Sequence, residues 1–386
     1  GIIPFIRSIS GITMQQATVP QPVSLVATPE GLMVQWPLDE TVVYPWFWLR
    51  DHGHDPDTLH PVTQQRQLYT AAVAEDITGT DATLDNDTVS VRWADGGESH
   101  FPVAFLARWR DTGYPADPAP ERILWDAGVI YREDPVVEHD AVMHTDEGLR
   151  DWLEQVLLYG FCRVQGVPTT PEATRQLAER VGYLRETLFG AFWDFTADLA
   201  RADTAYTNLE LRPHTDSTYS HDAPGLQLFH CLAFEGTGGE SVLVDGFRIA
   251  WELERNDPRA YRTLSRVRVP GQYIGDGARL RAERPVFRHD ADGKLVQVSF
   301  NNYDRAPFRL PDVEMAEFYR ALRAFEDLAN DPHYQWRYGL RPGEVLLFDN
   351  WRTLHGRAAY TGKRRLAGCY LNREDFESRL RVLGRR

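Results

Sequence analysis

Two histidines and one aspartate have the types and the spacing that a metal centre needs. His214 and Asp216 stand two residues apart in LRPHTDSTY, and His355 follows much later in DNWRTLHGR. On an extended segment, side chains two residues apart point to the same side. One imidazole and one carboxylate then face the same point. A second imidazole completes the two-histidine, one-carboxylate set that leaves positions open on Fe(II).

The same three letters occur once more, at His144, Thr145 and Asp146. There, EGLRDWLEQVLLYG carries apolar residues at helical spacing, so Thr145 or Asp146 is predicted to cap a helix that ends at Gly160. The later copy is followed by turn residues and by the strand-like GLQLFHCL. We therefore predict that the later copy binds the metal. The alternative is a histidine that is hydrogen-bonded within a polar network.

A metal centre of this kind leaves room for dioxygen and for a bidentate 2-oxo acid, whose far carboxylate needs a cation. Arg364 lies shortly after His355, at the start of the strand-like RRLAGCYL. A guanidinium suits this task because its planar fork grips a carboxylate with two hydrogen bonds. The alternative is that Arg364 is a surface charge in the basic run from Lys363 to Arg365.

Aromatic residues near the proposed ligands form a second signal. Four of them are candidates for a cage around a quaternary ammonium: Phe189, Trp193, Tyr206 and Tyr370. Such a cage holds the cation through the ring quadrupoles and needs no hydrogen bond. Composition alone favours the alternative, in which these rings belong to the hydrophobic core.

Composition sets limits on the class of protein. The 386 residues suffice for one large and one smaller domain, and the formal charge of −14 repels nucleic acid and anionic membranes. No run of 18 apolar residues predicts a membrane span. Cys162, Cys231 and Cys369 form no paired framework, so we expect a reducing, cytoplasmic location. Residues 1–14 are expected to be an added leader ahead of a native Met14.

The elements that must position these residues fall into two predicted domains. Strand-like runs and turn residues over 15–115 predict a small β-rich domain, and the Pro-rich, acidic segment 116–140 predicts a connector. Over 141–386, strands lie before, between and after the proposed ligands, with helices at the edges. This pattern is mainly β with flanking helices and predicts a double-stranded β-helix, a jelly-roll variant.

Local signals place several of these elements. Thr170 is predicted to cap a helix that stops at Gly182, and Gly236–Gly239 is predicted to be a tight turn between strands. A second helix is predicted over 311–330. Its core face is expected to consist of Met315, Phe318, Tyr319, Leu322 and Phe325.

The N-terminal domain carries a group of histidines at His52, His54, His60 and His100. Histidines two residues apart can bind zinc. No cysteine accompanies them, and two prolines in the same stretch are typical of a surface loop. We favour solvated loop histidines over a zinc site.

Long stretches of the chain resemble the γ-butyrobetaine and trimethyllysine hydroxylases, which are Fe(II)- and 2-oxoglutarate-dependent dioxygenases. The resemblance runs from Trp46 to the C-terminus and includes YPWFWLRDH, FTADLARADTAYT, HTDSTY, LFHCLAFEGTGGESVLVDGF, FNNYDRA, DNWRTLHGR and GCYLNRED. It implies a jelly-roll catalytic domain. It also implies that His214, Asp216 and His355 bind iron and that Arg364 holds the distal carboxylate of 2-oxoglutarate.

The same resemblance assigns the substrate contacts. The four cage candidates match the trimethylammonium cage, with Phe189 standing where butyrobetaine hydroxylase has a tyrosine. Asn301 or Asn302 matches the region that contacts the other end of the substrate. Asp203 replaces an asparagine near the substrate carboxylate, so it repels an anionic end or favours an extra amine. Arg212 attracts a carboxylate or phosphonate and favours the opposite choice.

One departure from the family concerns structural zinc. The family's N-terminal domain binds zinc through three cysteines and a histidine. The corresponding positions in this chain are Gly53, Asp55, Thr58 and Gly97. We therefore expect no structural zinc, unless the nearby histidines rebuild the site.

The implied reaction consumes 2-oxoglutarate and dioxygen, uses ascorbate as reductant, and yields succinate, CO2 and a hydroxylated substrate. We favour a short zwitterion, 2-(trimethylammonio)ethylphosphonate or γ-butyrobetaine, and trimethyllysine is the alternative. A remote alternative of a different class is a non-catalytic protein that binds a quaternary amine. A homodimer is an expectation from the family.

Overall fold

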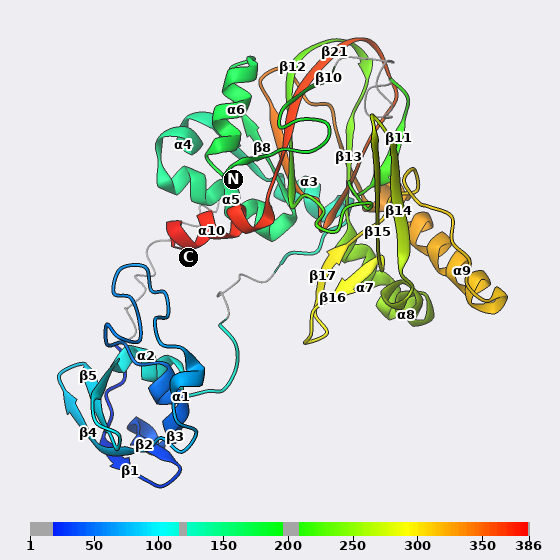
Figure 1. Cartoon of the computed structure of the whole chain (residues 1–386). Coiled ribbons are helices and arrows are strands. Elements are labelled where there is room, and N and C mark those ends of the chain that lie inside the picture. The colour runs from blue at the N-terminus through cyan, green and yellow to red at the C-terminus, as the bar shows by residue number, and fades with distance from the viewer. Residues whose placement is uncertain (1–17, 116–121, 196–207, 385–386) are drawn as a thin grey trace, which may run out of the picture. The chain divides into compact units, whose positions relative to one another are not determined.

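The computed structural model describes residues 18–115, 122–195 and 208–384. The predicted leader, 1–14, lies outside them. The chain divides into two units, Gly1–Asp117 and Pro118–Arg386 (Figure 1). None of the described helices is long and apolar enough to cross a membrane.

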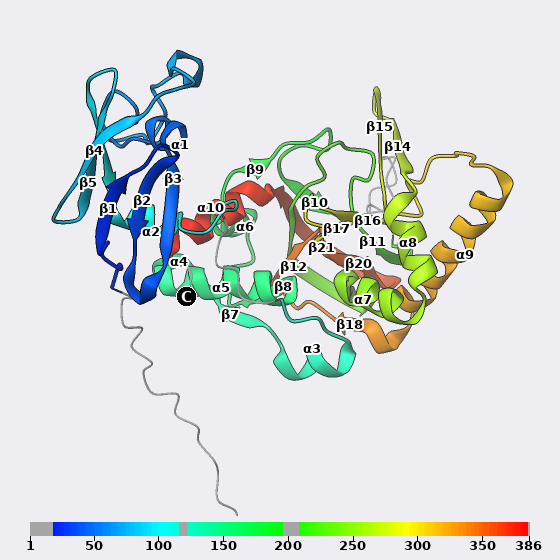
Figure 2. The same ribbon diagram turned by 90° about the horizontal axis from the view of Figure 1, so that it is seen from below.

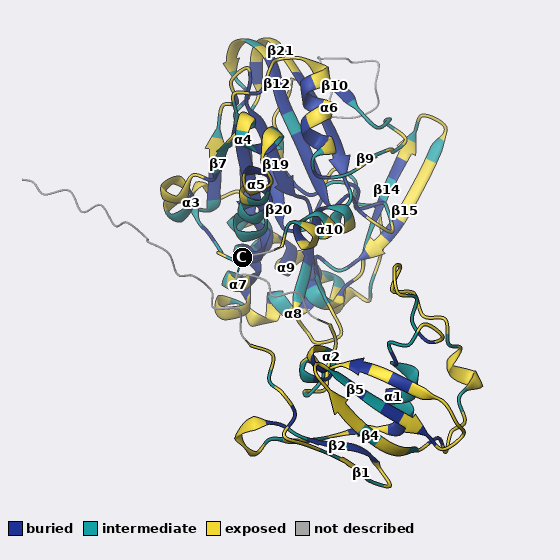
Figure 3. Cartoon of the chain, turned by 90° about the vertical axis from the view of Figure 1, so that its left-hand side faces the viewer, coloured by how far each residue is buried: buried dark blue, intermediate teal, exposed yellow. Residues whose placement is uncertain are grey.

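The first unit contains two antiparallel three-stranded sheets, ordered β1-β2-β3 and β4-β5-β6. In β5 and β6, buried residues alternate with more exposed ones, because successive side chains point to opposite faces (Figure 3). The buried set includes Val89, Val91 and Trp93 of β5 and forms a core of its own. The elements are β1 (Ser24–Ala27), β2 (Gly31–Gln35), β3 (Thr41–Pro45), α1 (Trp46–Asp51), β4 (Gly79–Asp85), β5 (Thr88–Trp93), β6 (Glu98–Pro102) and α2 (Val103–Arg108).

The second unit is the jelly-roll. Its main sheet has the order β10-β21-β12-β19-β8-β7, with β9 also paired to β21, and a second sheet has the order β11-β20-β13-β18. The main-sheet strands are β7 (Val136–Glu138), β8 (Phe161–Gln165), β9 (Leu184–Arg185), β10 (Trp193–Phe195), β12 (Leu226–Gly238), β19 (Val345–Asp349) and β21 (Tyr360–Leu371). The second sheet has β11 (Leu211–His214), β13 (Ser241–Asp245), β18 (Gln335–Tyr338) and β20 (Thr353–Arg357).

Side chains from both sheets meet in one apolar cluster. Phe161 and Phe348 of the main sheet pack in it with Leu243 and Trp336 of the second sheet. This packing of two inner sheet faces is the sandwich predicted from the sequence. Two hairpins, β14 (Val269–Gly275) with β15 (Ala278–Arg284) and β16 (Phe287–His289) with β17 (Leu295–Val298), complete the strands.

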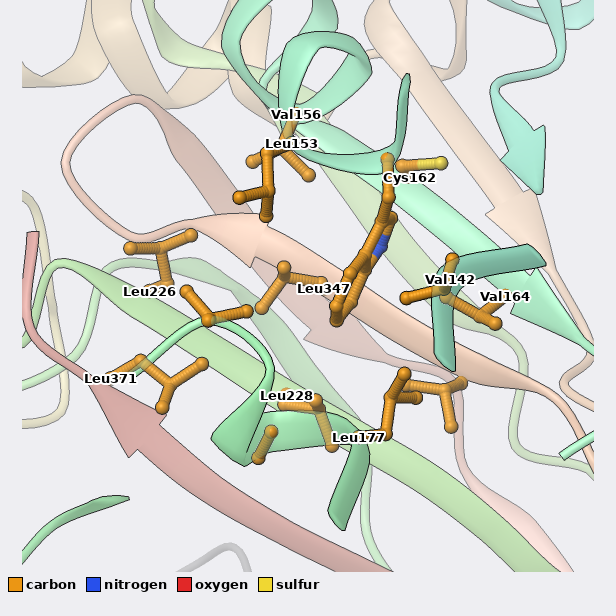
Figure 4. Packing of buried hydrophobic residues seen from close by; sticks show 14 of the residues in the cluster. Val142, Leu153, Val156, Cys162, Val164, Leu177, Leu226, Leu228, Leu347 and Leu371 are labelled. Carbon is orange, nitrogen blue, oxygen red and sulfur yellow. The ribbon is translucent and has the colours of Figure 1, made fainter. Parts of the chain in front are cut away.

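The helices of this unit gather in two groups, which Figures 1 and 2 show well apart. The first group packs on the main sheet through side chains such as Val156 and Leu177, which meet Leu228 and Leu347 (Figure 4). It contains α4 (His139–His144), α5 (Asp146–Tyr159), α6 (Pro171–Glu179) and α10 (Arg373–Leu383). The second group contains α7 (Gly246–Asn256), α8 (Pro258–Arg266) and α9 (Asp312–Ala329). A further helix, α3 (Ala127–Glu133), precedes β7.

Two helix starts agree with the sequence analysis. Thr145 caps α5, where its Oγ1 accepts a hydrogen bond from the Gly148 N–H at 2.9 Å, and the helix ends at Gly160 with φ of 82°. Thr170 caps α6 in the same way. However, α6 ends at Glu179, before the predicted stop, and Gly182 instead allows the close approach of Asp375.

Three other expectations need correction. Tyr319 is 52% exposed, because the buried stripe of α9 is centred on Phe318 and Phe325. The turn predicted over Gly236–Gly239 begins later, because Gly236 still pairs with Gly362 of β21 and β12 continues to Gly238. The segment expected as a connector contains α3 and β7, and β7 pairs in parallel with β8.

Candidate active site

The pairing of β11 with β20 brings the two predicted histidine ligands together. His214 and His355 are direct cross-strand partners, and their ring centroids lie 4.4 Å apart. Asp216 follows two residues after His214. Its Oδ1 lies 3.3 Å from His214 Nε2 and 3.4 Å from His355 Nε2. These three residues, far apart in sequence, therefore meet at one point.

The surroundings orient both imidazoles toward this point. The Nδ1–H of His214 donates to the Arg212 carbonyl at 2.7 Å, which leaves Nε2 as the free nitrogen. The ring of His355 packs on Phe348, with centroids 4.7 Å apart, and burial lowers its pKa. A lowered pKa keeps this imidazole neutral, which is the form that binds a metal.

Asp216 is held at its carboxylate and at its backbone. Tyr370 donates its hydroxyl to Oδ2 at 2.5 Å, and the Asn350 side chain bonds the Asp216 N–H at 2.8 Å and C=O at 3.2 Å. Burial would raise the pKa of Asp216, but the charges and hydrogen bonds of His355 and His214 hold it well below its usual value. The carboxylate is thus anionic and available as a ligand.

A short segment directly after β17 supports the loop between the first two ligands. The Thr215 N–H donates to the Phe300 carbonyl at 2.7 Å, and Asn301 Nδ2 donates to the Thr215 carbonyl at 3.1 Å. Asn301 Nδ2 also donates to Asp304 Oδ2 at 3.0 Å. Both Asn301 and Asp304 line the pocket beside the metal ligands. In this structure the Asn301 amide is engaged with the protein itself.

Two other residues that were predicted to contact the tail of the substrate, Asn302 and Arg212, do not line the pocket. The side chain of Asn302 is exposed and does not line the pocket. Arg212 is also exposed, and its contribution to the site comes from its backbone, whose N–H donates to the Tyr303 hydroxyl at 2.9 Å. Asp203 and Tyr206 lie outside the described residues.

A single pocket of about 1130 Å³, its open mouth included, contains the three ligands and two half-buried arginine side chains. These belong to Arg364 of β21 and Arg357 at the end of β20, and both lie over the ring of Tyr360. Burial lowers the pKa of Arg364 to about 10, and the nearby charge of Arg357 acts in the same direction. The Ser241 hydroxyl side chain lines the same region. This end of the pocket is suited to a carboxylate.

Arg364 differs from its basic neighbours. Lys363 and Arg365 are exposed, and Arg365 pairs with Asp194 at 2.7 Å on the surface. Arg364 lines the pocket, and no carboxylate of the described residues forms an ion pair with it. A half-buried guanidinium in a cavity is a ready partner for an anionic ligand.

Aromatic side chains cover the other part of the pocket. Trp193 of β10 and Tyr370 of β21 meet edge to face, with centroids 4.3 Å apart and planes at 80°. Phe189 and Tyr219 line the same pocket, and Tyr273 contacts both, with centroids 5.4 and 5.5 Å away. Three of the predicted cage residues, Phe189, Trp193 and Tyr370, are therefore in one place, beside the metal ligands.

Comparison with known proteins agrees with this site. The description "Taurine catabolism dioxygenase TauD, TfdA family" matches residues 130–370, and "Gamma-butyrobetaine hydroxylase-like, N-terminal" matches residues 23–107. Trimethyllysine dioxygenase of Meyerozyma guilliermondii is 35% identical over 92% of this chain and 94% of its own length. The human mitochondrial enzyme is 38% identical over 88% and 83%, and γ-butyrobetaine dioxygenase of Pseudomonas sp. is 34% identical over 92% and 94%.

The chain belongs to the γ-butyrobetaine and trimethyllysine hydroxylase family. It is an Fe(II)- and 2-oxoglutarate-dependent dioxygenase, so the alternative of a non-catalytic amine-binding protein is wrong. His214, Asp216 and His355 fit Fe(II), because their ligand atoms lie within 4.8 Å of one another and each carries an available lone pair.

Several residues of this hydroxylase site were not predicted from the sequence. Arg357 stands two residues after His355 on the same strand, so the period of two could have placed both on one side. Tyr219 closes the HTDSTY stretch and was not singled out. No sequence pattern indicated Asn350, because its side-chain amide contacts the backbone of Asp216 only in the folded domain.

The histidines of the N-terminal domain stack on aromatic rings or bond to backbone and hydroxyl groups. His52 stacks on Trp48 with centroids 4.5 Å apart, and His54 packs on Phe105 at 4.6 Å. His60 accepts hydrogen bonds from two backbone N–H groups, and His100 bonds the Ser90 hydroxyl. Among the described residues, only the ligand set of the hydroxylase pocket forms a group of three that could hold a metal.

The positions that replace the family's zinc ligands form a different arrangement. Thr58 is buried, and its hydroxyl donates to Asp55 Oδ2 at 2.9 Å. Gly53 leaves too little space for a side chain, because an added Cβ would lie 2.9 Å from Ser99 Oγ. Gly97 has φ of 89° and no neighbour that a Cβ would meet.

Proposed function

We propose that this enzyme hydroxylates trimethyllysine, with γ-butyrobetaine as the second candidate substrate. One observation carries the proposal: a single pocket joins the metal-ligand set, two guanidinium groups and several aromatic side chains. Each part has a partner in the reaction. The partners are Fe(II), the carboxylates of 2-oxoglutarate, and a quaternary ammonium.

Two arginines of the pocket form the proposed binding site for 2-oxoglutarate. When bound by His214, Asp216 and His355, Fe(II) supplies the coordination sites at which a 2-oxo acid and dioxygen are activated. Arg364 grips the far carboxylate of 2-oxoglutarate, and Arg357 adds positive charge beside it. Both guanidinium groups are partly shielded from water, so their attraction for an anion is stronger than it would be on the surface.

The aromatic part of the pocket orients the substrate. Phe189, Trp193, Tyr219 and Tyr370 present rings to a trimethylammonium head, which they hold by cation–π attraction while excluding water. Because the head is fixed at a set distance from the metal ligands, one methylene of the chain lies next to the reacting centre. This positioning selects the carbon that is hydroxylated.

The choice of trimethyllysine has two supports. Trimethyllysine dioxygenases from a yeast and from human are 35% and 38% identical over most of this chain. In addition, Asp304 places a carboxylate in the pocket lining, and it does not belong to the group of described residues that could hold a metal. It attracts the α-ammonium of an amino acid and repels the carboxylate of γ-butyrobetaine. The Pseudomonas relative, at 34%, favours γ-butyrobetaine as the second candidate.

This choice replaces the sequence-based preference for a short zwitterion. Arg212, which favoured a carboxylate or phosphonate tail, has an exposed side chain outside the pocket lining. 2-(Trimethylammonio)ethylphosphonate stays a prediction that the same assay tests.

The deciding experiment is an aerobic assay with Fe(II), ascorbate and 2-oxoglutarate. Trimethyllysine, γ-butyrobetaine and the phosphonate are supplied separately, and succinate and the mass gain of one oxygen atom are followed. Hydroxylation of trimethyllysine at the highest kcat/KM supports the proposal, and a higher value for either other amine overturns the substrate choice. His214→Ala should abolish succinate production and weaken Co(II) binding. Turnover by this variant at the wild-type rate would refute the ligand assignment.

A further inference from the structure

Tyr370 takes part in two functions of the site at once. Its ring meets Trp193 edge to face, 4.3 Å between centroids, in the proposed ammonium cage. Its hydroxyl donates a hydrogen bond of 2.5 Å to Asp216 Oδ2. Tyr370 is only 6% exposed, and its backbone in β21 is paired with Arg185 of β9 on one side and Gln227 of β12 on the other. One rigidly held side chain thus links the cage to a metal ligand.

The two oxygens of Asp216 have different partners. Oδ1 faces the Nε2 atoms of His214 and His355, and Oδ2 faces Tyr370. Asn350 bonds only the backbone of Asp216, so it does not restrain rotation of the carboxylate. Once a metal occupies the point between the histidines, Tyr370 is the remaining described partner that fixes this rotation.

We propose that Tyr370 is a positioning residue that restricts Asp216 to one ligand oxygen and couples the occupancy of the ammonium cage to metal binding. A carboxylate free to rotate can bind a metal through both oxygens and fill a position that the 2-oxo acid needs. The coupling to the cage rests on the proposed function, whereas the restriction of Asp216 does not.

The coupling has a physical cause. A quaternary ammonium against the ring immobilises Tyr370 and makes its hydroxyl a better donor, since the cation withdraws electron density from the phenol. The hydrogen bond to Asp216 is then better formed before the metal arrives. By thermodynamic linkage, the cation and the metal each raise the affinity of the protein for the other by the same factor.

The first test is titration of the full-length apoenzyme with Co(II), followed by visible absorption, with no 2-oxo acid present. Tyr370→Phe keeps the ring and removes the hydroxyl. We expect its Co(II) affinity to fall about 10-fold, the usual effect of removing a hydrogen-bond partner of a ligand. We also expect an altered Co(II) spectrum, because the carboxylate binds differently. Wild-type affinity together with a wild-type spectrum would overturn the positioning role.

Tyr183→Phe is the matched control, since Tyr183 is 82% exposed and does not line this pocket. This variant should keep the wild-type Co(II) affinity, and an equal loss in both variants would contradict a specific role of Tyr370. A thermal melt of each apoenzyme checks that the variants are folded.

The second test adds tetramethylammonium to the Co(II) titration. The wild type should bind Co(II) more tightly with the cation present, and Tyr370→Phe should show no such gain. A wild type that is insensitive to the cation would overturn the coupling, with no need of a variant. If none of the three amines is hydroxylated but Tyr370→Phe still loses Co(II) affinity, the proposed substrate class fails and the positioning role stands.

Discussion

At the scale of single residues, a proton competes with the metal at His214. Burial lowers the pKa of His214, but the hydrogen bond and charge of Asp216 outweigh burial and raise it. The pKa of His355 is lowered, and that of Asp216 is held well below its usual value. As the pH falls, His214 is therefore the first ligand to gain a proton, and a protonated Nε2 cannot bind a metal.

We predict that the affinity for Co(II) is highest at pH values above the raised pKa of His214. The affinity should decline as the pH falls through this pKa. The limiting slope should be one proton per metal, because Asp216 stays ionised and His355 stays neutral in that range. Co(II) titrations at a series of pH values measure this. An affinity that stays constant from alkaline to mildly acidic pH would contradict the prediction.

A second prediction concerns the carboxylate end of the pocket. Arg364→Lys keeps the charge but loses the planar fork, so KM for 2-oxoglutarate should rise about 10-fold or more. Arg365→Lys is the control, since Arg365 forms an exposed ion pair with Asp194 that contributes little. Succinate release measures KM for both variants. Equal KM values would show that Arg364 does not bind the far carboxylate of 2-oxoglutarate.

At the scale of elements, a glycine lets β11 approach β20. An added Cβ at Gly356 would lie 2.4 Å from the Leu211 carbonyl oxygen. The strands could accept it only by moving apart, and this would separate His214 from His355.

We therefore predict that Gly356→Ala weakens Co(II) binding by at least about 10-fold, as loss of ligand geometry does. Gly339→Ala is the matched control, because an added Cβ there meets nothing within 4 Å. Unchanged Co(II) affinity in Gly356→Ala would show that the strand spacing does not set the ligand geometry.

The β14–β15 hairpin also acts on the metal loop. Arg284, the last residue of β15, is buried and donates to the carbonyls of Ser217 and Ser220 and to the Ser299 hydroxyl. Ser217, directly after Asp216, has φ of 59°, a conformation that costs energy for a residue with a side chain. The guanidinium holds this turn in place.

Arg284→Met should lower the free energy of unfolding by about 3 kcal/mol, because two loop carbonyls lose a charged donor in a buried place. Arg281→Met, at an exposed position of the same strand, should change it by less than about 0.5 kcal/mol. Denaturant unfolding of both variants measures this free energy. Similar losses in the two variants would show that Arg284 does not hold the turn in place.

At the scale of the whole molecule, each unit has its own core. The buried set of the first unit includes Leu49 and Trp36, and every described ligand and cage residue belongs to the second unit. Leu49→Ala should cost about 2 to 5 kcal/mol of stability in the first unit. Co(II) affinity should stay unchanged, and a loss of metal binding by this folded variant would show that the site depends on the N-terminal unit.

The sequence by itself determined the features that depend on local chemistry. Thr145 and Thr170 cap their helices because a hydroxyl two or three residues from a free N–H needs no distant partner. The residue types and spacing of His214 and Asp216 were sufficient to predict ligands. The family resemblance then favoured the site roles of Arg364 and of the cage rings over their alternatives, and the fold brings Arg364 and three of the four rings into one pocket.

Only the tertiary structure decided contacts between residues far apart in the chain. The bond from Tyr370 to Asp216, the amide of Asn350 and the clamp of Arg284 join segments that have no common periodicity. The same holds for Tyr319, which the packing of α9 leaves exposed, and for Gly236, which a neighbouring strand approaches. Local patterns record which groups a residue can offer, whereas the register of strands and the packing of helices decide which partner it meets.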